Sequence, residues 1–172
     1  MNKPALLLLA TLAGCAMFQP TSATAAAGPS REGPLLGTFD SRLLALAYYR
    51  SSAFKERLDT VRAEHARALA VGDAETAHRI EKEMSDLQSH IHLQGFGTAP
   101  VPEILALIES EIPAIAKNAG VQAVASRWDL VWQEPGASFP DLSYELAASF
   151  HPDAETLKVM KEAARMAPVP LP

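Results

Sequence analysis

The chain has 172 residues, with 15 Lys+Arg against 20 Asp+Glu, a formal net charge of −5 and a single cysteine. This acidic balance argues against a nucleic-acid partner, which needs a concentrated positive surface. One cysteine excludes a disulfide within the domain, and a hydrophobic fraction of 48% predicts one folded domain with a modest core.

The first residues have the layout of an export signal. Residues 1–18 (MNKPALLLLATLAGCAMF) combine one lysine with an apolar run too short to span a membrane comfortably. The segment LAGC at residues 12–15 resembles the bacterial lipobox, in which the signal is cut before a cysteine that becomes acylated. We therefore predict a signal peptide at 1–14, lipidation at Cys15 and a lipidated tether at 15–34.

The position of the mature protein follows from the cleavage site. Ala16 follows the cysteine where a retention-type Asp would stand, which favours the outer membrane, with the domain facing the periplasm. The segment ATA at residues 23–25 offers an alternative site for ordinary signal peptidase. Cleavage after Ala25 would release a soluble periplasmic protein, and the sequence leaves both sites open.

The folded part is expected to begin with a strand and a helix. LLGTFD (residues 35–40) is a β-compatible run, and Asp40 or Ser41 can cap a helix that begins at Arg42. Ser51 and Ser52 interrupt the helical pattern.

A helical hairpin follows this interruption. Apolar or seam positions then recur with heptad spacing, and Gly72-Asp73 divides them into two arms at about 53–71 and 73–93. The first arm contributes Phe54, Leu58, Val61, His65 and Ala68, and the second contributes Ala77, Ile80, Met84, Leu87 and Ile91. These ten residues are called the seam below.

The return from the hairpin is expected to rebuild a small body. GFGTAPVP (residues 95–102) stops the second arm, and a helix at 103–118 should kink or split at Pro113. Period-two alternation predicts a β-hairpin at 120–134, followed by a short strand at 139–142. Helices at 143–150 and about 154–166 close the domain, and a proline-rich tail at 167–172 is predicted to be disordered.

This order of elements resembles the Skp/OmpH family of periplasmic chaperones. The similarity is carried by residues 112–150 (IPAIAKNAGVQAVASRWDLVWQEPGASFPDLSYELAASF) and by residues 35–58 (LLGTFDSRLLALAYYRSSAFKERL). The resemblance implies an α+β fold with a small β-body and a projecting antiparallel helical hairpin, as a single domain at 35–166. It also implies a homo-oligomer, a trimer in the family, whose hairpins surround unfolded client chains.

Two features depart from the family pattern. The hairpin is short, and its arms (residues 53–94) carry 6 Lys+Arg against 8 Asp+Glu, whereas the family chaperones are strongly basic. Both departures argue against a typical chaperone function more than they argue against the fold.

Candidates for chemistry are few. His90 and His92 form an H-x-H pair, but positions two apart on a helix diverge, so we predict polar residues near a helix end and no metal site. His65 is predicted to be a hydrogen-bonded seam residue that can approach His78 or Ile80 across the turn. The aromatic residues Tyr48, Tyr49, Trp128 and Trp132 are predicted to serve the core or a subunit interface. No P-loop or nucleophile motif is present, and we predict no enzymatic activity and no cofactor.

These observations predict a cell-envelope holdase or assembly factor that binds unfolded outer-membrane or periplasmic proteins. The alternative is a structural or adaptor lipoprotein that docks one folded partner through the hairpin. A third, less favoured hypothesis is a small-ligand protein that uses a face with Trp128 and Trp132.

Overall fold

A short parallel sheet opens the fold. The computed structural model describes residues 35–171, and its first element is β1 (Leu36–Phe39), which lies within the predicted strand. β1 pairs in parallel with β2 (Ala123–Ser126), in a register that sets Leu36 opposite Ala123 and Phe39 opposite Ser126. On its other side β1 makes one isolated bridge, between Thr38 and Asp141. Among the described residues, the sheet is therefore β2–β1 with a single bridge beyond it.

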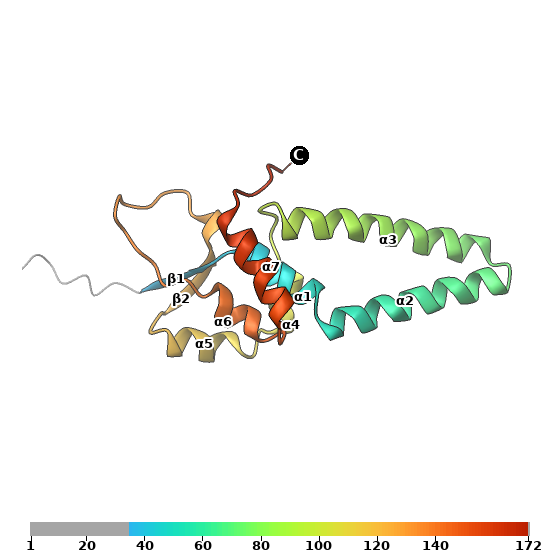
Figure 1. Ribbon diagram of the computed structural model, residues 1–172, viewed down its shortest axis with the longest axis horizontal. Coiled ribbons are helices and arrows are strands. Elements are labelled where there is room, and N and C mark those ends of the chain that lie inside the picture. The colour runs from blue at the N-terminus through green and yellow to red at the C-terminus, as the bar shows by residue number, and fades with distance from the viewer. Residues whose placement is uncertain (1–34, 172) are drawn as a thin grey trace, which may run out of the picture. The chain divides into compact units, whose positions relative to one another are not determined.

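Helix α1 (Ser41–Tyr49) follows β1 directly and occupies the centre of the domain (Figure 1). The Asp40 side chain caps it by accepting from Arg42 N–H, as the sequence predicted. Every residue from Ser41 to Tyr48 is buried, because neighbouring helices cover all sides of this short apolar helix.

The core divides into two clusters on different sides of α1. Leu44 and Tyr48 pack in the larger cluster with β1, the following helices and the base of the hairpin, whereas Leu43 and Ala47 pack in the smaller one. The smaller cluster is completed by Met160 of α7 (Ala154–Arg165) and Ala147 of α6 (Ser143–Ala148). The first and last helices of the domain are thereby joined.

The predicted hairpin is present. Its arms are α2 (Ser52–Ala70) and α3 (Ala74–Gly95), which run side by side away from the sheet and α1 (Figure 1). Gly72 turns the chain with φ of +73°, a conformation that costs glycine little. Asp73 caps α3 by accepting from Thr76 N–H, and Ser51 caps α2 by accepting from Phe54 N–H.

The predicted helix at 103–118 is split into α4 (Pro102–Leu107) and α5 (Ile112–Asn118). Both begin with a proline in the first turn, Pro102 and Pro113, where the missing N–H would have had no helical partner. The split at residues 108–111 follows from this preference.

The β-hairpin predicted at 120–134 is wrong. Only Ala123–Ser126 forms a strand, and its partner is β1, nearly ninety positions earlier in the chain. Ser126 then caps a short 3₁₀ helix, Arg127–Asp129, by accepting from Trp128 N–H, which ends the strand. The strand predicted at 139–142 is reduced to the bridge at Asp141.

The C-terminal elements follow the predicted helices more closely. α6 and α7 fall within the predicted ranges, and Asp153 caps α7 by accepting from Thr156 N–H. Residues 167–171, for which we predicted disorder, lie against the end of α3, where Val169 N–H donates to Phe96 O at 2.8 Å. In content the domain is α+β: within residues 35–171 it has seven α-helices and a two-stranded parallel sheet.

Candidate functional site

The seam of the hairpin is arranged as the heptad spacing predicts. All ten seam residues are buried or half-buried, whereas the other residues of both arms are exposed, apart from Thr76 near the turn and Leu93, Gln94 and Gly95 at the base. Burial is deepest near the two ends of the hairpin. Ala68, Ala77 and Ile80 are buried close to the turn, and Phe54 is buried at the base.

The middle of the seam is only partly closed. Leu58, Val61, Met84, Leu87 and Ile91 remain half-buried. A groove of about 260 Å³ lies between the arms, and it is lined by Arg57, Leu58, Val61, Glu83, Met84 and Leu87. A second hollow of about 430 Å³ is lined by Arg62, His65, Glu81, Met84, Ser85 and Gln88. Met84 therefore borders both openings.

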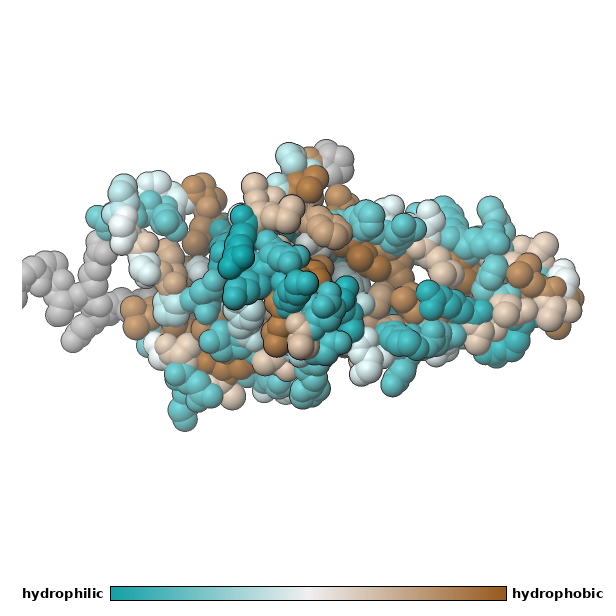
Figure 2. Space-filling model, in the orientation of Figure 1, coloured by the Kyte–Doolittle hydropathy of each residue, from teal (hydrophilic) through white to brown (hydrophobic). Residues whose placement is uncertain are grey.

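The turn of the hairpin adds a second apolar surface. Leu69 is 58% exposed and Val71 is 79% exposed, although both precede a glycine turn that could have carried polar residues. Figure 2 shows apolar residues between the arms and again at the turn, with hydrophilic residues along the outer faces.

Charges on the outer faces of the arms largely compensate one another. Lys55–Asp59, Arg79–Glu83 and Lys82–Asp86 are exposed pairs four residues apart, with nitrogen–oxygen distances of 2.6–2.7 Å. Exposed pairs of this kind contribute little stability, about 0.3–0.5 kcal/mol each. Because these charged side chains keep the outer faces hydrated, the seam is the apolar surface of the hairpin.

His65 is a hydrogen-bonded seam residue, as predicted, but its partner is not a residue named in advance. Its Nε2 lies 3.0 Å from Glu81 Oε1, and His78 Nδ1 lies 3.7 Å from Glu81 Oε2. Within residues 35–171, no group of three or more His, Cys, Asp and Glu side chains is placed to hold a metal ion.

The H-x-H pair separates into two unrelated contacts. His90 Nε2 lies 3.0 Å from Glu103 Oε1 of α4, whereas the His92 ring packs edge-on against Phe96 at 5.8 Å. His90 thus joins the end of α3 to α4, a contact that the helix-end hypothesis did not include.

A polar cluster at the hairpin base surrounds the buried Gln94. Its amide Nε2 donates to Glu103 Oε1 at 2.6 Å and to Pro100 O at 2.7 Å, while its Oε1 accepts from the Tyr49 hydroxyl. Burial raises the pKa of Tyr49 to about 12, and the negative charge of Glu103 adds to this shift. Burial alone would raise the pKa of Glu103, but hydrogen bonds from Gln94 and His90 hold it below its usual value.

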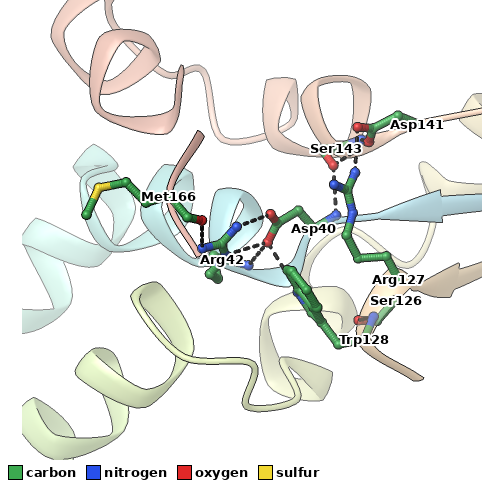
Figure 3. Close-up of polar contacts among 8 residues, drawn as sticks. All are labelled: Asp40, Arg42, Ser126, Arg127, Trp128, Asp141, Ser143 and Met166. Atoms are coloured by element: carbon green, nitrogen blue, oxygen red, sulfur yellow. Dashed lines mark hydrogen bonds and ion pairs between the residues drawn. The ribbon is translucent and has the colours of Figure 1, made fainter. Parts of the chain in front are cut away.

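A buried ion pair lies where β1 passes into α1. Asp40 is 1% exposed and Arg42 is 4% exposed. Arg42 Nη2 donates to Asp40 Oδ2 at 2.7 Å and Arg42 Nε donates to Asp40 Oδ1 at 3.0 Å, which is the bidentate geometry (Figure 3). Arg42 Nη1 donates to Met166 O at 2.9 Å, so the pair also fixes the end of α7.

Trp128 covers this pair. Its Nε1 donates to Asp40 Oδ1 at 3.3 Å, and Arg42 Cζ lies 5.1 Å from the ring centroid, within cation–π range (Figure 3). Both Asp40 oxygens thus accept hydrogen bonds, and the pair holds the end of β1, α1 and Trp128 together. The sequence marked Asp40 only as a helix cap and gave no signal for Arg42.

A second polar chain continues from Asp40 to the start of α6. Asp40 N–H donates to Ser143 Oγ at 2.8 Å, the Ser143 hydroxyl donates to Asp141, and Arg127 also donates to Asp141 (Figure 3). Burial would raise the pKa of Asp141, but the hydrogen bonds from Ser143 and Arg127 lower it overall. The segment Asp141-Leu142-Ser143 therefore forms the joint between the sheet and α6.

The remaining predicted aromatic residues have different positions. Tyr48 and Tyr49 pack with Phe54 at the base of the hairpin, with ring centroids 4.8–5.2 Å apart, which places them in or beside the core. Trp132 is 76% exposed on the loop after the 3₁₀ helix, whereas Trp128 is half-buried over the Asp40–Arg42 pair. Cys15, the predicted lipidation site, lies outside the described residues.

Comparisons with known proteins return no family model, no curated protein and no solved structure that matches this chain. In the part of the chain that the structure describes, no helix is both long and apolar enough to cross a membrane.

Proposed function

We propose that this chain is a non-enzymatic holdase or assembly factor of the cell envelope that binds unfolded outer-membrane or periplasmic proteins. The observation that carries the proposal is the partly open seam. Five apolar side chains of the seam remain half-buried, and four of them (Leu58, Val61, Met84 and Leu87) border a groove between the arms.

The physical basis is incomplete burial. A two-helix hairpin closes its seam from two sides only, so part of each apolar side chain stays in contact with water. An unfolded chain can cover this surface, and each square ångström of apolar area removed from water contributes about 25 cal/mol. Contacts of this kind are non-directional, which suits clients of varied sequence, and they need no nucleotide.

The acidic arms set the preferred client segments. With 6 Lys+Arg against 8 Asp+Glu on residues 53–94, the arms do not attract acidic chains by charge. We therefore expect apolar segments with neutral or basic flanks to bind best, in contrast to the preference implied for the basic Skp/OmpH chaperones.

The resemblance to Skp/OmpH chaperones supports two further parts of the proposal. The described residues have the order strand, helical hairpin, helices, strand and closing helices, although they lack the β-hairpin that the resemblance implies. On the resemblance we propose that copies associate through the body. We also propose an outer-membrane lipid anchor at Cys15, which metabolic labelling with a fatty acid would test. Label that persists in Cys15→Ser would exclude this anchor.

The adaptor hypothesis has its own observation. Leu69 and Val71 form a small exposed apolar patch at the turn, which fits one folded partner better than a long unfolded chain. Under this alternative, Val71→Asp abolishes partner binding while substitutions in the open seam have little effect.

Paired hairpin variants test the holdase proposal. Met84→Glu places a negative charge between the two openings, whereas Lys82→Glu reverses a charge on the outer face and so changes the net charge by a larger amount away from the seam. We expect Met84→Glu to reduce suppression of client aggregation severalfold and Lys82→Glu to leave it nearly unchanged. Equal effects of the two variants, with both still folded by circular dichroism, would contradict binding at the seam.

A further inference from the structure

The outer edge of β2 carries backbone groups that the sheet does not use. Ala123 N–H donates to Leu35 O, which places the Ala123 amide on the side that faces β1. Parallel ladders alternate, so Ala125 also faces β1, whereas Val124 and Ser126 direct their N–H and C=O groups away from it. β2 has only β1 as a partner among the described residues.

A hollow of about 330 Å³ lies beside this edge. It is bordered by Phe39, Ser41, Pro100, Val101, Pro102, Leu105, Val124, Ala125, Ser126 and Asp129. Most of these side chains are apolar. The hollow meets the sheet at the carboxyl ends of both parallel strands, where α/β arrangements place their ligands.

Ser41 adds an independent sign of a missing partner. It borders the hollow, it is 1% exposed, and its Oγ has no hydrogen-bond partner in the described part of the chain. A buried hydroxyl without a partner costs about 1–3 kcal/mol, so most are satisfied in folded proteins. A polar group that entered the hollow could satisfy it.

We propose that an extended polypeptide strand, supplied by an unfolded client, pairs with the outer edge of β2 and inserts one apolar side chain into this hollow. Donors and acceptors that recur at every second residue match an extended backbone, because its own groups recur with the same period. This inference rests on the proposed function and names the form in which a client is recognised.

The charge near the hollow restricts which client sequences fit. Asp129 is the charged residue that borders the hollow, and the whole chain is acidic. A strand in which apolar and basic residues alternate therefore fits better than one with acidic residues. Its apolar side chains face the hollow while its basic side chains remain in water or approach Asp129.

Ser126 allows a direct test of edge pairing. Its φ is −63°, which is the value that proline adopts, and its N–H points away from β1. Ser126→Pro therefore removes an outward donor without removing a bond of the β1–β2 ladder. Ser126→Ala is the matched control, since it keeps the N–H but loses the hydroxyl that accepts from Trp128 N–H.

The probe is a blocked hexapeptide of alternating valine and lysine, titrated into the purified protein by calorimetry. We expect Ser126→Pro to weaken binding about three- to tenfold, as the loss of one backbone hydrogen bond implies, and Ser126→Ala to change it less than about twofold. A peptide with glutamate in place of lysine should bind more weakly than the parent.

A modified peptide keeps the test valid if Ser126→Pro fails to fold. The same hexapeptide with N-methyl groups on alternate residues cannot pair along the edge, and it should bind the unaltered protein at least about threefold more weakly. Equal binding of the methylated and parent peptides would overturn the inference. So would an oligomer that Ser126→Pro dissociates while no peptide binds, which would assign the edge to a second copy.

The two proposals can fail separately. If the hexapeptide does not bind but client aggregation is still suppressed, the edge inference fails and the holdase proposal stands. If the hexapeptide binds with the expected Ser126→Pro effect but aggregation is not suppressed, the edge is a strand-binding site and the holdase proposal fails.

Discussion

At the scale of single residues, the Asp40–Arg42 pair connects the most distant parts of the domain. It joins the end of β1 to Trp128 and to the carbonyl of Met166, which is 124 positions from Arg42. A buried pair of this kind stabilises little as a whole, but losing one partner leaves an uncompensated charge in the interior.

Arg42→Leu is therefore expected to lower the free energy of unfolding by about 3–5 kcal/mol. The double variant Asp40→Asn/Arg42→Leu should recover part of this loss, because it removes the orphaned charge. Arg62→Leu, which breaks an exposed pair with Asp59, serves as control and should cost less than about 1 kcal/mol. Urea unfolding measures the free energy of all three variants. If Arg42→Leu lowers it no more than the control does, the Asp40–Arg42 pair does not hold the domain together.

The raised pKa of Tyr49 makes the stability of the domain depend on pH in the alkaline range. Its pKa is raised to about 12 in the folded protein from 10.0, so the unfolded chain loses this proton first as the pH rises. The contribution of Tyr49 to stability is complete below pH 10 and falls as the pH rises towards 12. Absorbance titration should show one tyrosine that ionises near pH 12 and disappears in Tyr49→Phe, and an unchanged titration in that variant would contradict the assignment.

At the scale of elements, the sequence pattern predicted the features that depend on residues close together in the chain, such as helices and their caps. The heptad spacing placed all ten seam residues correctly, and of the two predicted caps Asp40 is the one that caps α1. The sheet could not be predicted in the same way. Alternation near Val121 and Ala125 indicates a strand but not its partner, and the partner β1 is nonlocal.

The same distinction explains the candidate surfaces. The hairpin follows from spacing alone, whereas its partly open middle depends on how far the two arms separate. The hollow beside β2 needs Ser41, Val101 and Ser126, which only the folded chain brings together. Arg42 was missed because its burial depends on Trp128 and Met166.

Gly72 is the element-scale test. Its φ of +73° predicts that Gly72→Ala lowers the free energy of unfolding by about 1 kcal/mol, although space for a methyl group exists. Gly95→Ala, at a helical glycine where a new Cβ would meet Leu46 at 3.6 Å, should be neutral or stabilising. Thermal unfolding compares the two, and equal shifts would contradict the left-handed turn at Gly72.

At the scale of the whole molecule, the domain combines a locked base with a hairpin whose seam is not fully closed. The base is fixed by the Asp40–Arg42 pair, by the Gln94 cluster and by the packing of α7 on α1. The hairpin leaves apolar side chains partly exposed, and the outer edge of β2 leaves backbone groups free of the sheet. We interpret this division as rigid support for two weakly selective binding surfaces, as the proposed binding of an unfolded client requires.

The most direct test dilutes a denatured outer-membrane β-barrel protein into increasing concentrations of the chain that begins at Gly28. Light scattering follows aggregation, and gel filtration follows the complex. The account predicts suppression at near-stoichiometric protein, with a defined complex that contains the client. Aggregation equal to that in buffer alone would contradict the holdase function and would direct attention to a folded partner at the turn of the hairpin.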